Sequence, residues 1–400
     1  MARVMGPTGE PVRRTTGVYS ATSIRDQRVS TFRPHPLPPD PPLQLRPEDR
    51  NLIEAASREL GRLDALSSML PDVSLFLYSY VRKEALVSAQ IEGTQSSFAD
   101  LLVHESGDAP GVPNDDVSEV SDYVAALELG LQRLRGGMPL SSRLLREIHA
   151  VLMRSGRGRN SDAGRFRRVP VWLGGTQPQN AVFVPPSAPD IAPCIADLER
   201  FLHDEPSATP TLLKAAMAHV QFETIHPFLD GNGRLGRLLI TLILCAEGAL
   251  VEPILFLSLH FKQNRSAYYD GLQRVRAEGD WEGWVRFFLQ GVVETARSGV
   301  DTTRRILDQF ERDRQTIEVT LDRAAASALQ VHRAFQHRPL RSVRDLMQVT
   351  GRTAPTVSRI IKQLVDLGML DELTGNQRYR RYVYRPYLDI LSEGTEPLPR

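Results

Sequence analysis

The stretch His226-Pro-Phe-Leu-Asp-Gly-Asn-Gly-Arg-Leu-Gly-Arg237 decides how the rest of the chain is interpreted. A helical pattern ends near Thr224, and a new apolar helix is expected from about Arg234 through Leu244. Between the two lies the glycine-rich run 230–233, just before a helix N-terminus. Consecutive backbone N–H groups there can form a nest for a phosphate, and the helix dipole adds partial positive charge. The stretch therefore predicts an anion site between two helices.

The side chains of this stretch supply what a phosphate site needs. Arg234 and Arg237 are three residues apart and share a helical face. Asp230 is a hard oxygen ligand suited to Mg²⁺ beside phosphates, and His226 titrates near neutrality at the position where a general base is needed. A glycine-containing turn with a capping aspartate and an unrelated histidine explains any one of these residues, but not the whole set. The set predicts phosphate-bond chemistry on a Mg-nucleotide.

The stretch resembles the signature of the Fic family, His-x-Phe-x-Asp/Glu-Gly-Asn-Gly-Arg-x-x-Arg, and matches it at every fixed position. The resemblance implies a mainly α fold, with a Fic-type helical core and a β-hairpin flap. It also implies transfer of AMP from ATP to a hydroxyl side chain of a target protein, with His226 as general base. The other roles that it implies are Mg²⁺ binding by Asp230, a hold on the α- and β-phosphates by Gly231, Asn232 and Gly233, a phosphate contact by Arg234, and a γ-phosphate contact by Arg237.

A second stretch, Gly164-Arg-Phe-Arg-Arg-Val-Pro-Val-Trp-Leu-Gly-Gly175 followed by Pro185-Pro186, resembles the flap that aligns the target segment by strand addition. A covering hairpin without function is the alternative. The residues that would dock the target are Val171, Trp172, Leu173 and Gly174.

A third stretch, Asn264-Arg-Ser-Ala-Tyr-Tyr-Asp-Gly-Leu272, resembles the family segment that packs on the adenine and ribose. Tyr268 is the favoured ring, although either Tyr268 or Tyr269 could belong to the core.

A fourth stretch, Ser88-Ala-Gln-Ile-Glu-Gly93, resembles the inhibitory motif Ser/Thr-x-x-x-Glu-Gly/Asn of the family. Ser88 and Glu92 are four residues apart, hence on one helical face, and Gly93 suits a helix C-terminus. The mechanism implied is an ion pair between Glu92 and Arg237, which removes the arginine that should orient the γ-phosphate. A solvated glutamate near a helix end is the alternative.

The composition is that of an ordinary globular protein. The 400 residues are 41% hydrophobic and 24% charged, with 49 basic and 48 acidic residues, which excludes a collagen and a wholly disordered chain. Two cysteines provide neither a disulfide framework nor a zinc set. The longest apolar run, Leu238–Ala246, is far shorter than the roughly 20 residues of a membrane span. We expect no membrane partner, no signal peptide and a cytoplasmic location.

The net charge of +1 hides a basic C-terminal module at 331–391. Its pattern of helix, turn, helix and hairpin resembles a winged helix. DNA contact through the second helix, which opens near Thr353, is one interpretation, and a protein-interaction or dimerisation module of the same fold is the other. A homodimer stays open. In the DNA interpretation, the residues on phosphates would be Arg378, Arg380 or Arg381.

The sequence thus predicts six successive segments. They are a mobile tail at 1–31, a helical segment with the inhibitory motif at 32–110, a Fic catalytic core at 111–300, a connector helix at 301–330, a winged helix at 331–391 and a tail at 392–400. The first hypothesis is an adenylyltransferase that uses Mg-ATP and is inhibited by its own Glu92. The alternatives are a DNA-binding transcriptional regulator whose Fic core senses nucleotide, and a Fic enzyme that moves another phosphate-containing group or removes AMP.

Overall fold

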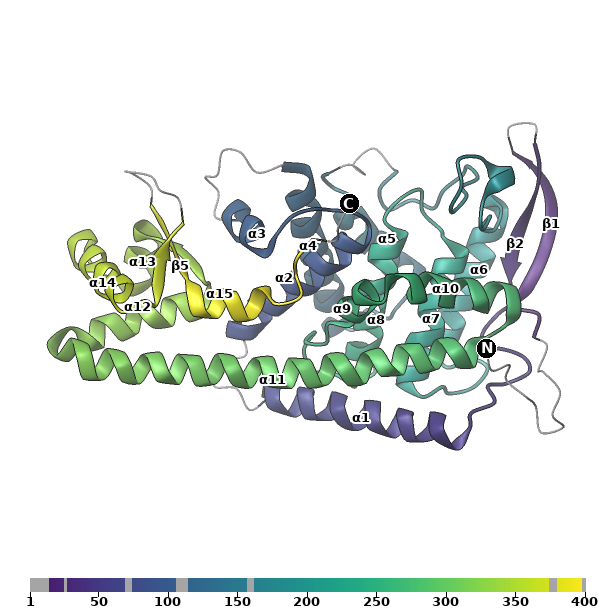
Figure 1. The fold of residues 1–400 in the computed structure, drawn as a ribbon. Helices are drawn as coiled ribbons and strands as arrows, with labels where there is room; N and C mark the ends of the chain where they lie inside the picture. The colour runs from purple at the N-terminus through teal and green to yellow at the C-terminus, as the bar shows by residue number, and fades with distance from the viewer. Residues whose placement is uncertain are drawn as a thin grey trace.

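Helices make up most of the structure, as the sequence predicts. The structure, a computed structural model, describes residues 14–24, 27–68, 74–105, 114–156, 162–373 and 380–397. Its described strands form two small sheets. Figure 1 shows the helices gathered around a central pair, α7 and α8, with a smaller module at the far end of one long helix, α11. The helices outside that module are α1 (Pro47–Ser68), α2 (Ser74–Ile91), α3 (Phe98–Glu105), α4 (Asn114–Arg135), α5 (Ser142–Leu152), α6 (Ala188–Leu202), α7 (Thr211–Ile225), α8 (Asn232–Ala246), α9 (Leu257–Gln263), α10 (Arg265–Glu278) and α11 (Trp281–Leu321).

The central pair carries the decisive stretch between its two helices. Every residue of α7 from Leu212 to Ile225 is buried, so this helix has no solvent face. The helix α8 is buried over most of its length as well, and the two helices pack against each other. Neighbouring helices cover the pair on all sides, since α4, α5 and α2 contact α8 while α6, α10 and α11 contact α7. Burying each leucine or isoleucine stabilises the fold by about 1.5–3 kcal/mol, which fixes the loop between α7 and α8 in place.

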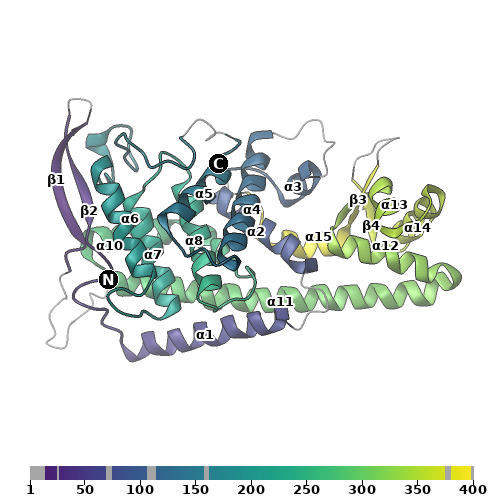
Figure 2. The ribbon, with the colours of Figure 1, turned by 180° about the vertical axis from the view of Figure 1, so that it is seen from behind.

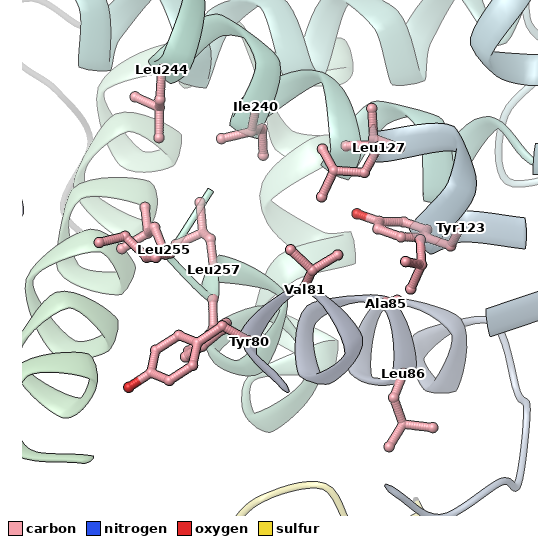
Figure 3. Close-up of a cluster of buried hydrophobic side chains, with 14 of the residues drawn as sticks. Tyr80, Val81, Ala85, Leu86, Tyr123, Leu127, Ile240, Leu244, Leu255 and Leu257 are labelled. Atoms are coloured by element: carbon pink, nitrogen blue, oxygen red, sulfur yellow. The ribbon is translucent and has the colours of Figure 1, made fainter. Parts of the chain in front are cut away.

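The helix that carries the inhibitory motif is part of the core. Helix α2 contacts α4, α8 and α9. Figure 3 shows its buried side chains interleaved with those of the neighbouring segments. The labelled side chains are Tyr80, Val81, Ala85 and Leu86 of α2, Tyr123 and Leu127 of α4, Ile240 and Leu244 of α8, and Leu255 and Leu257. The middle of α2 therefore packs in one buried cluster with α4 and the C-terminal half of α8.

The mobile tail predicted for residues 1–31 is wrong for the part that the structure describes. Gly17–Ile24 and Gln27–Pro34 form the paired antiparallel strands β1 and β2, while residues 1–13 lie outside the described residues. The physical reason is a partner that a local pattern does not reveal. Ile24 and Val29 pack on Val184 and Trp172, far along the chain, and form a small apolar cluster apart from the main core.

The proline-rich segment after the hairpin contains neither helix nor strand. Arg14 holds it, because its Nε donates a hydrogen bond to the carbonyl of Pro41 at 2.6 Å. The same guanidinium forms a buried ion pair with Glu282 at the start of α11, at 2.6 Å. The N-terminal segment is thereby tied to the core.

The connector helix predicted for 301–330 is not a separate element. Helix α11 runs without a break from Trp281 to Leu321 and crosses the boundary expected at 300. Buried positions such as Val300, Ile306, Phe310 and Ile317 continue at helical spacing through this boundary. The first interruption comes after the last turn of α11, where a short 3₁₀ turn leads into the next helix. The core and the C-terminal module therefore share one helix, which lies along α1 in both views (Figures 1 and 2).

The C-terminal module combines helices with a three-stranded antiparallel sheet in the order β3-β5-β4. Its elements are α12 (Ala325–His337), β3 (Leu340–Ser342), α13 (Val343–Thr350), α14 (Ala354–Asp366), β4 (Leu370–Glu372), β5 (Arg381–Tyr384) and α15 (Arg385–Ser392). The order of helix, turn, helix and strand pair is the one expected from the sequence. The turn expected at 374–376 and Arg378 lie outside the described residues. Of the other two arginines expected to contact phosphates, Arg380 is exposed and lies 3.6 Å from Glu372, whereas Arg381 is buried, so the phosphate role predicted for Arg381 is wrong.

The tail predicted at 392–400 packs on the core over its described part. After α15, residues 393–397 return to the core, where Gln90 Nε2 donates to the carbonyl of Thr395 at 2.8 Å. Lys262 Nζ, on α9, donates to the carbonyl of Gly394 at 3.2 Å and to Gln90 Oε1 at 2.7 Å. The segment contributes main-chain carbonyls, which any sequence supplies, so the pattern of side chains did not reveal this contact. None of the helices described is both long and apolar enough to cross a bilayer.

Candidate active site

The loop between α7 and α8 has a fixed geometry. His226 ends α7 in a left-handed conformation, with φ 48° and ψ 60°. Gly231 precedes α8 with φ 77°, also left-handed. Asn232 closes the loop, because its side-chain Oδ1 accepts a hydrogen bond from the N–H of Phe228 and its Nδ2 donates to the carbonyl of Phe228, both at 2.9 Å. The side chain of Asn232 therefore shapes the loop, and the phosphate contact implied for it stays a prediction.

Two glycines keep the N-terminus of α8 open. A Cβ atom on Gly231 would lie 2.6 Å from the sulfur of Met153, and its positive φ is costly for other residues. A Cβ atom on Gly233 would lie 2.2 Å from Oε1 of Glu92. The carboxylate of Glu92 thus lies directly against the backbone of the first turn of α8, where an anion is favoured by the helix dipole.

The structure brings the inhibitory motif to Arg237. The guanidinium of Arg237 is buried, with its Nε donating to Ser88 Oγ at 2.9 Å. Its Nη2 donates to the carbonyl of Ser88 at 2.9 Å and to Glu92 Oε1 at 2.8 Å. Burial lowers the pKa of Arg237, but the Glu92 carboxylate together with Tyr268, Tyr269 and Glu223 outweighs burial, so that the net pKa lies above its usual value. Gly93 follows the helix with φ 99°, as a helix C-terminus favours.

His226 lies in an environment that keeps it neutral. The side chain is half-buried at the end of α7. Burial, together with the positive charges of Arg167 and Arg276, lowers the pKa of His226 to about 3. At neutral pH the imidazole is therefore uncharged and able to accept a proton.

Of the two remaining charged residues of the stretch, Asp230 is exposed and Arg234 is buried. The carboxylate of Asp230 is half-exposed, and its Oδ1 accepts from the N–H of Gly231 at 2.6 Å. Arg234 is buried, with Nη1 at 3.3 Å from Glu119 Oε2 and Nη2 at 3.5 Å from the sulfur of Met153. Arg234 thus anchors α8 to α4, and the phosphate contact implied for it stays a prediction. Asp230 fits Mg²⁺, because this ion is commonly bound by one or two carboxylates together with substrate phosphates and water.

A histidine on α5 supports the loop, and the sequence did not reveal it. His149 accepts a hydrogen bond from the N–H of Gly164 at its Nδ1, and its Nε2 donates to the carbonyl of Asp230, both at 2.9 Å. The ring stacks on Phe228 at 3.7 Å between centroids. Burial lowers the pKa of His149 to about 4, in agreement with the neutral form that these two bonds require. A lone histidine on the buried face of a helix carries no distinguishing pattern, whereas Arg167 belongs to the quoted flap stretch and its position alone hinted at a role.

The ring predicted to pack on the adenine is wrong. Tyr268 is buried, and its hydroxyl donates to Nε2 of His219 at 2.9 Å, while Nδ1–H of His219 donates to the carbonyl of Gly236 at 2.9 Å. Tyr268 therefore belongs to the core. The neighbouring Tyr269 is 41% exposed, and it is the tyrosine of this pair that a ligand can reach.

The flap is less regular than predicted. In place of a β-hairpin, a single antiparallel bridge joins Leu173 to Phe183, with a 3₁₀ turn at Pro178–Asn180 between them. Val171 and Trp172 are half-buried and Gly174 is exposed, with a positive φ. The hairpin β1–β2 extends this bridge, because the N–H of Phe32 donates to the carbonyl of Val184 at 2.9 Å. Prolines and paired glycines within the flap limit its ladder to this one bridge.

The helical fold and this loop define a protein with a capped anion site between two central helices. Residues 50–132 match the Fic/DOC family N-terminal model, and residues 139–244 match the Fic/DOC family model. These two segments of the chain are therefore similar to Fic/DOC domains. A crystal structure of a Fic family protein from Desulfovibrio desulfuricans G20 aligns with a TM-score of 0.57 at 24% identity, covering 86% of this chain and 97% of that one, which shows the shared fold.

Two curated relatives carry the same name, which states an adenylyltransferase activity. Protein adenylyltransferase Fic from Culex quinquefasciatus is 31% identical over 257 residues, which are 62% of this chain and 45% of the relative. Protein adenylyltransferase Fic from Drosophila melanogaster is 39% identical over 135 residues, which are 34% of this chain and 25% of the relative. The chain spans less than half the length of these relatives.

Proposed function

We propose that this protein transfers AMP from Mg-ATP to a hydroxyl side chain of a target protein, and that Glu92 restrains the transfer. The observation that carries the proposal is the engagement of Arg237 by Ser88 and Glu92 beside the open N-terminus of α8. The curated relatives named protein adenylyltransferase Fic support the reaction class.

The residues of the loop account for each part of the reaction. The neutral His226 takes the proton of a Ser, Thr or Tyr hydroxyl as its oxygen attacks the α-phosphorus. The new O–P bond forms as the bond from the α-phosphorus to the bridging oxygen breaks, and pyrophosphate leaves. Backbone N–H groups at the start of α8 stabilise the phosphate charge. Asp230 would hold Mg²⁺, which neutralises phosphate charge when bound.

The restraint follows from the position of one carboxylate. Glu92 Oε1 is 2.8 Å from Arg237 and lies against Gly233, so it satisfies both the arginine and the positive end of the helix. A γ-phosphate needs the same arginine and the same anion position. In this proposal, the protein is therefore active only when Glu92 leaves Arg237.

The proposal is tested with ATP labelled at one phosphate at a time. The Glu92→Gly protein is incubated with a cell extract and Mg²⁺, with ³²P at the α- or the γ-position of ATP, and labelled proteins are separated by electrophoresis. We expect protein-bound label from the α-position alone. Label from the γ-position alone would replace AMP transfer by phosphoryl transfer, and release of AMP from a pre-labelled protein would indicate the reverse reaction.

A second activity, binding of DNA by the C-terminal module, is favoured by the exposure of Arg359 and Lys362 on α14. The opposite face of α14 is buried in the module. We expect the full-length chain to retard mixed-sequence duplex DNA at 50 mM salt, with binding that weakens steeply at 200 mM. Replacing both residues by alanine should reduce the salt dependence by about two phosphate contacts, whereas Arg304→Ala on α11 should not. Absence of any retardation at 50 mM salt would leave a protein partner for this module.

A further inference from the structure

We propose that Arg167 is a positioning residue that locks His226 in its left-handed conformation and ties both ends of the flap to it. The proposal rests on the proposed function, since it assigns a task to His226 as base. Arg167 lies between the loop that follows α5 and the flap, and its side chain is 2% exposed. It is the point at which three segments of the site meet.

The contacts of Arg167 converge on the backbone around the base. Its Nε donates to the carbonyl of His226 at 2.8 Å, and its own N–H donates to the carbonyl of Pro227 at 2.9 Å. Both carbonyls belong to the turn in which His226 has φ 48°. A non-glycine residue in this region is strained by about 1 kcal/mol or more and persists only where its surroundings hold it. Two directed hydrogen bonds from one residue provide that hold.

The same guanidinium reaches both ends of the flap. Its Nη2 donates to the carbonyl of Pro186 at 2.6 Å, and its Nη1 donates to the carbonyl of Val169 at 3.3 Å. Val169 lies near the start of the flap, two residues after Arg167, and Pro186 ends it. A target segment that aligns on the flap is therefore placed relative to His226 through one planar, rigid group. Lysine could replace it only in part, because a single ammonium keeps the charge but cannot satisfy three carbonyls that are spread around a fork.

The charge of Arg167 is unusual for its surroundings. Among the described residues no carboxylate pairs with it, so carbonyl oxygens alone compensate for the lost water. Burial lowers the pKa of Arg167 to about 10, so it stays charged at neutral pH. A buried cation without a counter-ion costs stability. The charge has a use here, because it disfavours protonation of the nearby His226.

The groups that face His226 come from three elements. Arg167 approaches from the flap side and Arg276 from α10, and the main-chain carbonyl of Glu223 comes from α7. The first two lower the pKa of His226 and the third raises it. Removal of Arg167 takes away the largest of the charge effects, so the pKa of His226 should rise toward its usual value.

The test compares Arg167→Met and Arg167→Lys with Arg168→Met, all in the Glu92→Gly protein. Arg168 is the exposed neighbour and serves as the matched control. We expect Arg167→Met to lower the rate of AMP transfer about ten- to a hundred-fold, as misplacement of a reacting group does. We expect Arg167→Lys to recover part of the rate, and both variants to bind ATP within two-fold of the parent.

A second measurement does not depend on turnover. With ¹³C-labelled histidine, the NMR titration of His226 should move to higher pH in Arg167→Met and stay low in Arg167→Lys and Arg168→Met. Unchanged transfer rates and an unchanged titration would overturn the proposal, as would loss of ATP binding in equal proportion, which indicates a merely structural role. If the parent protein transfers no AMP, the proposed function fails, and the titration alone still decides the role of Arg167.

Discussion

The Glu92→Gly variant should transfer AMP about ten to a hundred times faster than the unaltered protein. Glu92 makes a charge-assisted hydrogen bond of 2.8 Å to a fully buried guanidinium, and such bonds contribute about 1.5–3 kcal/mol. Each 1.4 kcal/mol corresponds to a factor of ten. Because Glu92 follows the end of α2, glycine at this position does not interrupt a helix. The measurement is the initial rate of α-³²P incorporation into protein at saturating Mg-ATP.

A series of substitutions at Glu92 separates the effect of its charge from the effect of its volume. Glu92→Gln keeps the shape and loses the charge, so its rate should lie between those of the unaltered and glycine proteins. Glu128→Gln, on the exposed face of α4, removes one negative charge elsewhere and should leave the rate unchanged. Equal rates for the unaltered and Glu92→Gly proteins, across several extracts, would contradict the restraint by Glu92.

His226→Ala in the Glu92→Gly protein should abolish transfer, with a loss of at least a hundred-fold. The neutral imidazole is the group placed to accept the proton of the attacking hydroxyl. ATP binding, measured by isothermal titration calorimetry, should persist, because the proposed function assigns the phosphates to the N-terminus of α8 and not to the imidazole. The expected result is therefore a fall in turnover with little change in affinity.

His203→Ala provides the comparison for this variant, since His203 is exposed just after α6. It should transfer AMP at the parent rate. If His226→Ala kept more than a tenth of the parent rate, another group would have to accept the proton, and the assignment of the base would be wrong.

The sequence predicted those parts of the site whose residues occur at fixed spacing in short motifs. His226, the glycines before α8, and the pairing of Glu92 with Arg237 all follow from short motifs. The structure places the last two side chains 2.8 Å apart, although they are 145 residues apart in the chain. The motif could not reveal which polar groups are used up inside the protein. The side chain of Asn232 hydrogen-bonds the backbone of Phe228, and Arg234 pairs with Glu119. Only the three-dimensional packing shows these contacts.

The same limit explains the errors in the fold. The helices of the core follow from apolar spacing, which is a local property. The hairpin β1–β2 and the return of residues 393–397 depend on partners more than a hundred residues away. Tyr268 and Tyr269 are adjacent and chemically alike, so only the direction of the helix face decides which of them is buried.

The return of the C-terminal segment changes what a shortened protein would mean. Gln90 lies between Ser88 and Glu92 on the motif, and the carbonyl of Thr395 is one of its partners. Tyr387 of α15 hydrogen-bonds Ser79 on the same helix at 3.1 Å. A chain that stops at residue 300 would end in the middle of α11, and α2 would lose these contacts. Its activity would report on a core with an altered inhibitory helix, so the full-length chain is the proper reference for every rate discussed above.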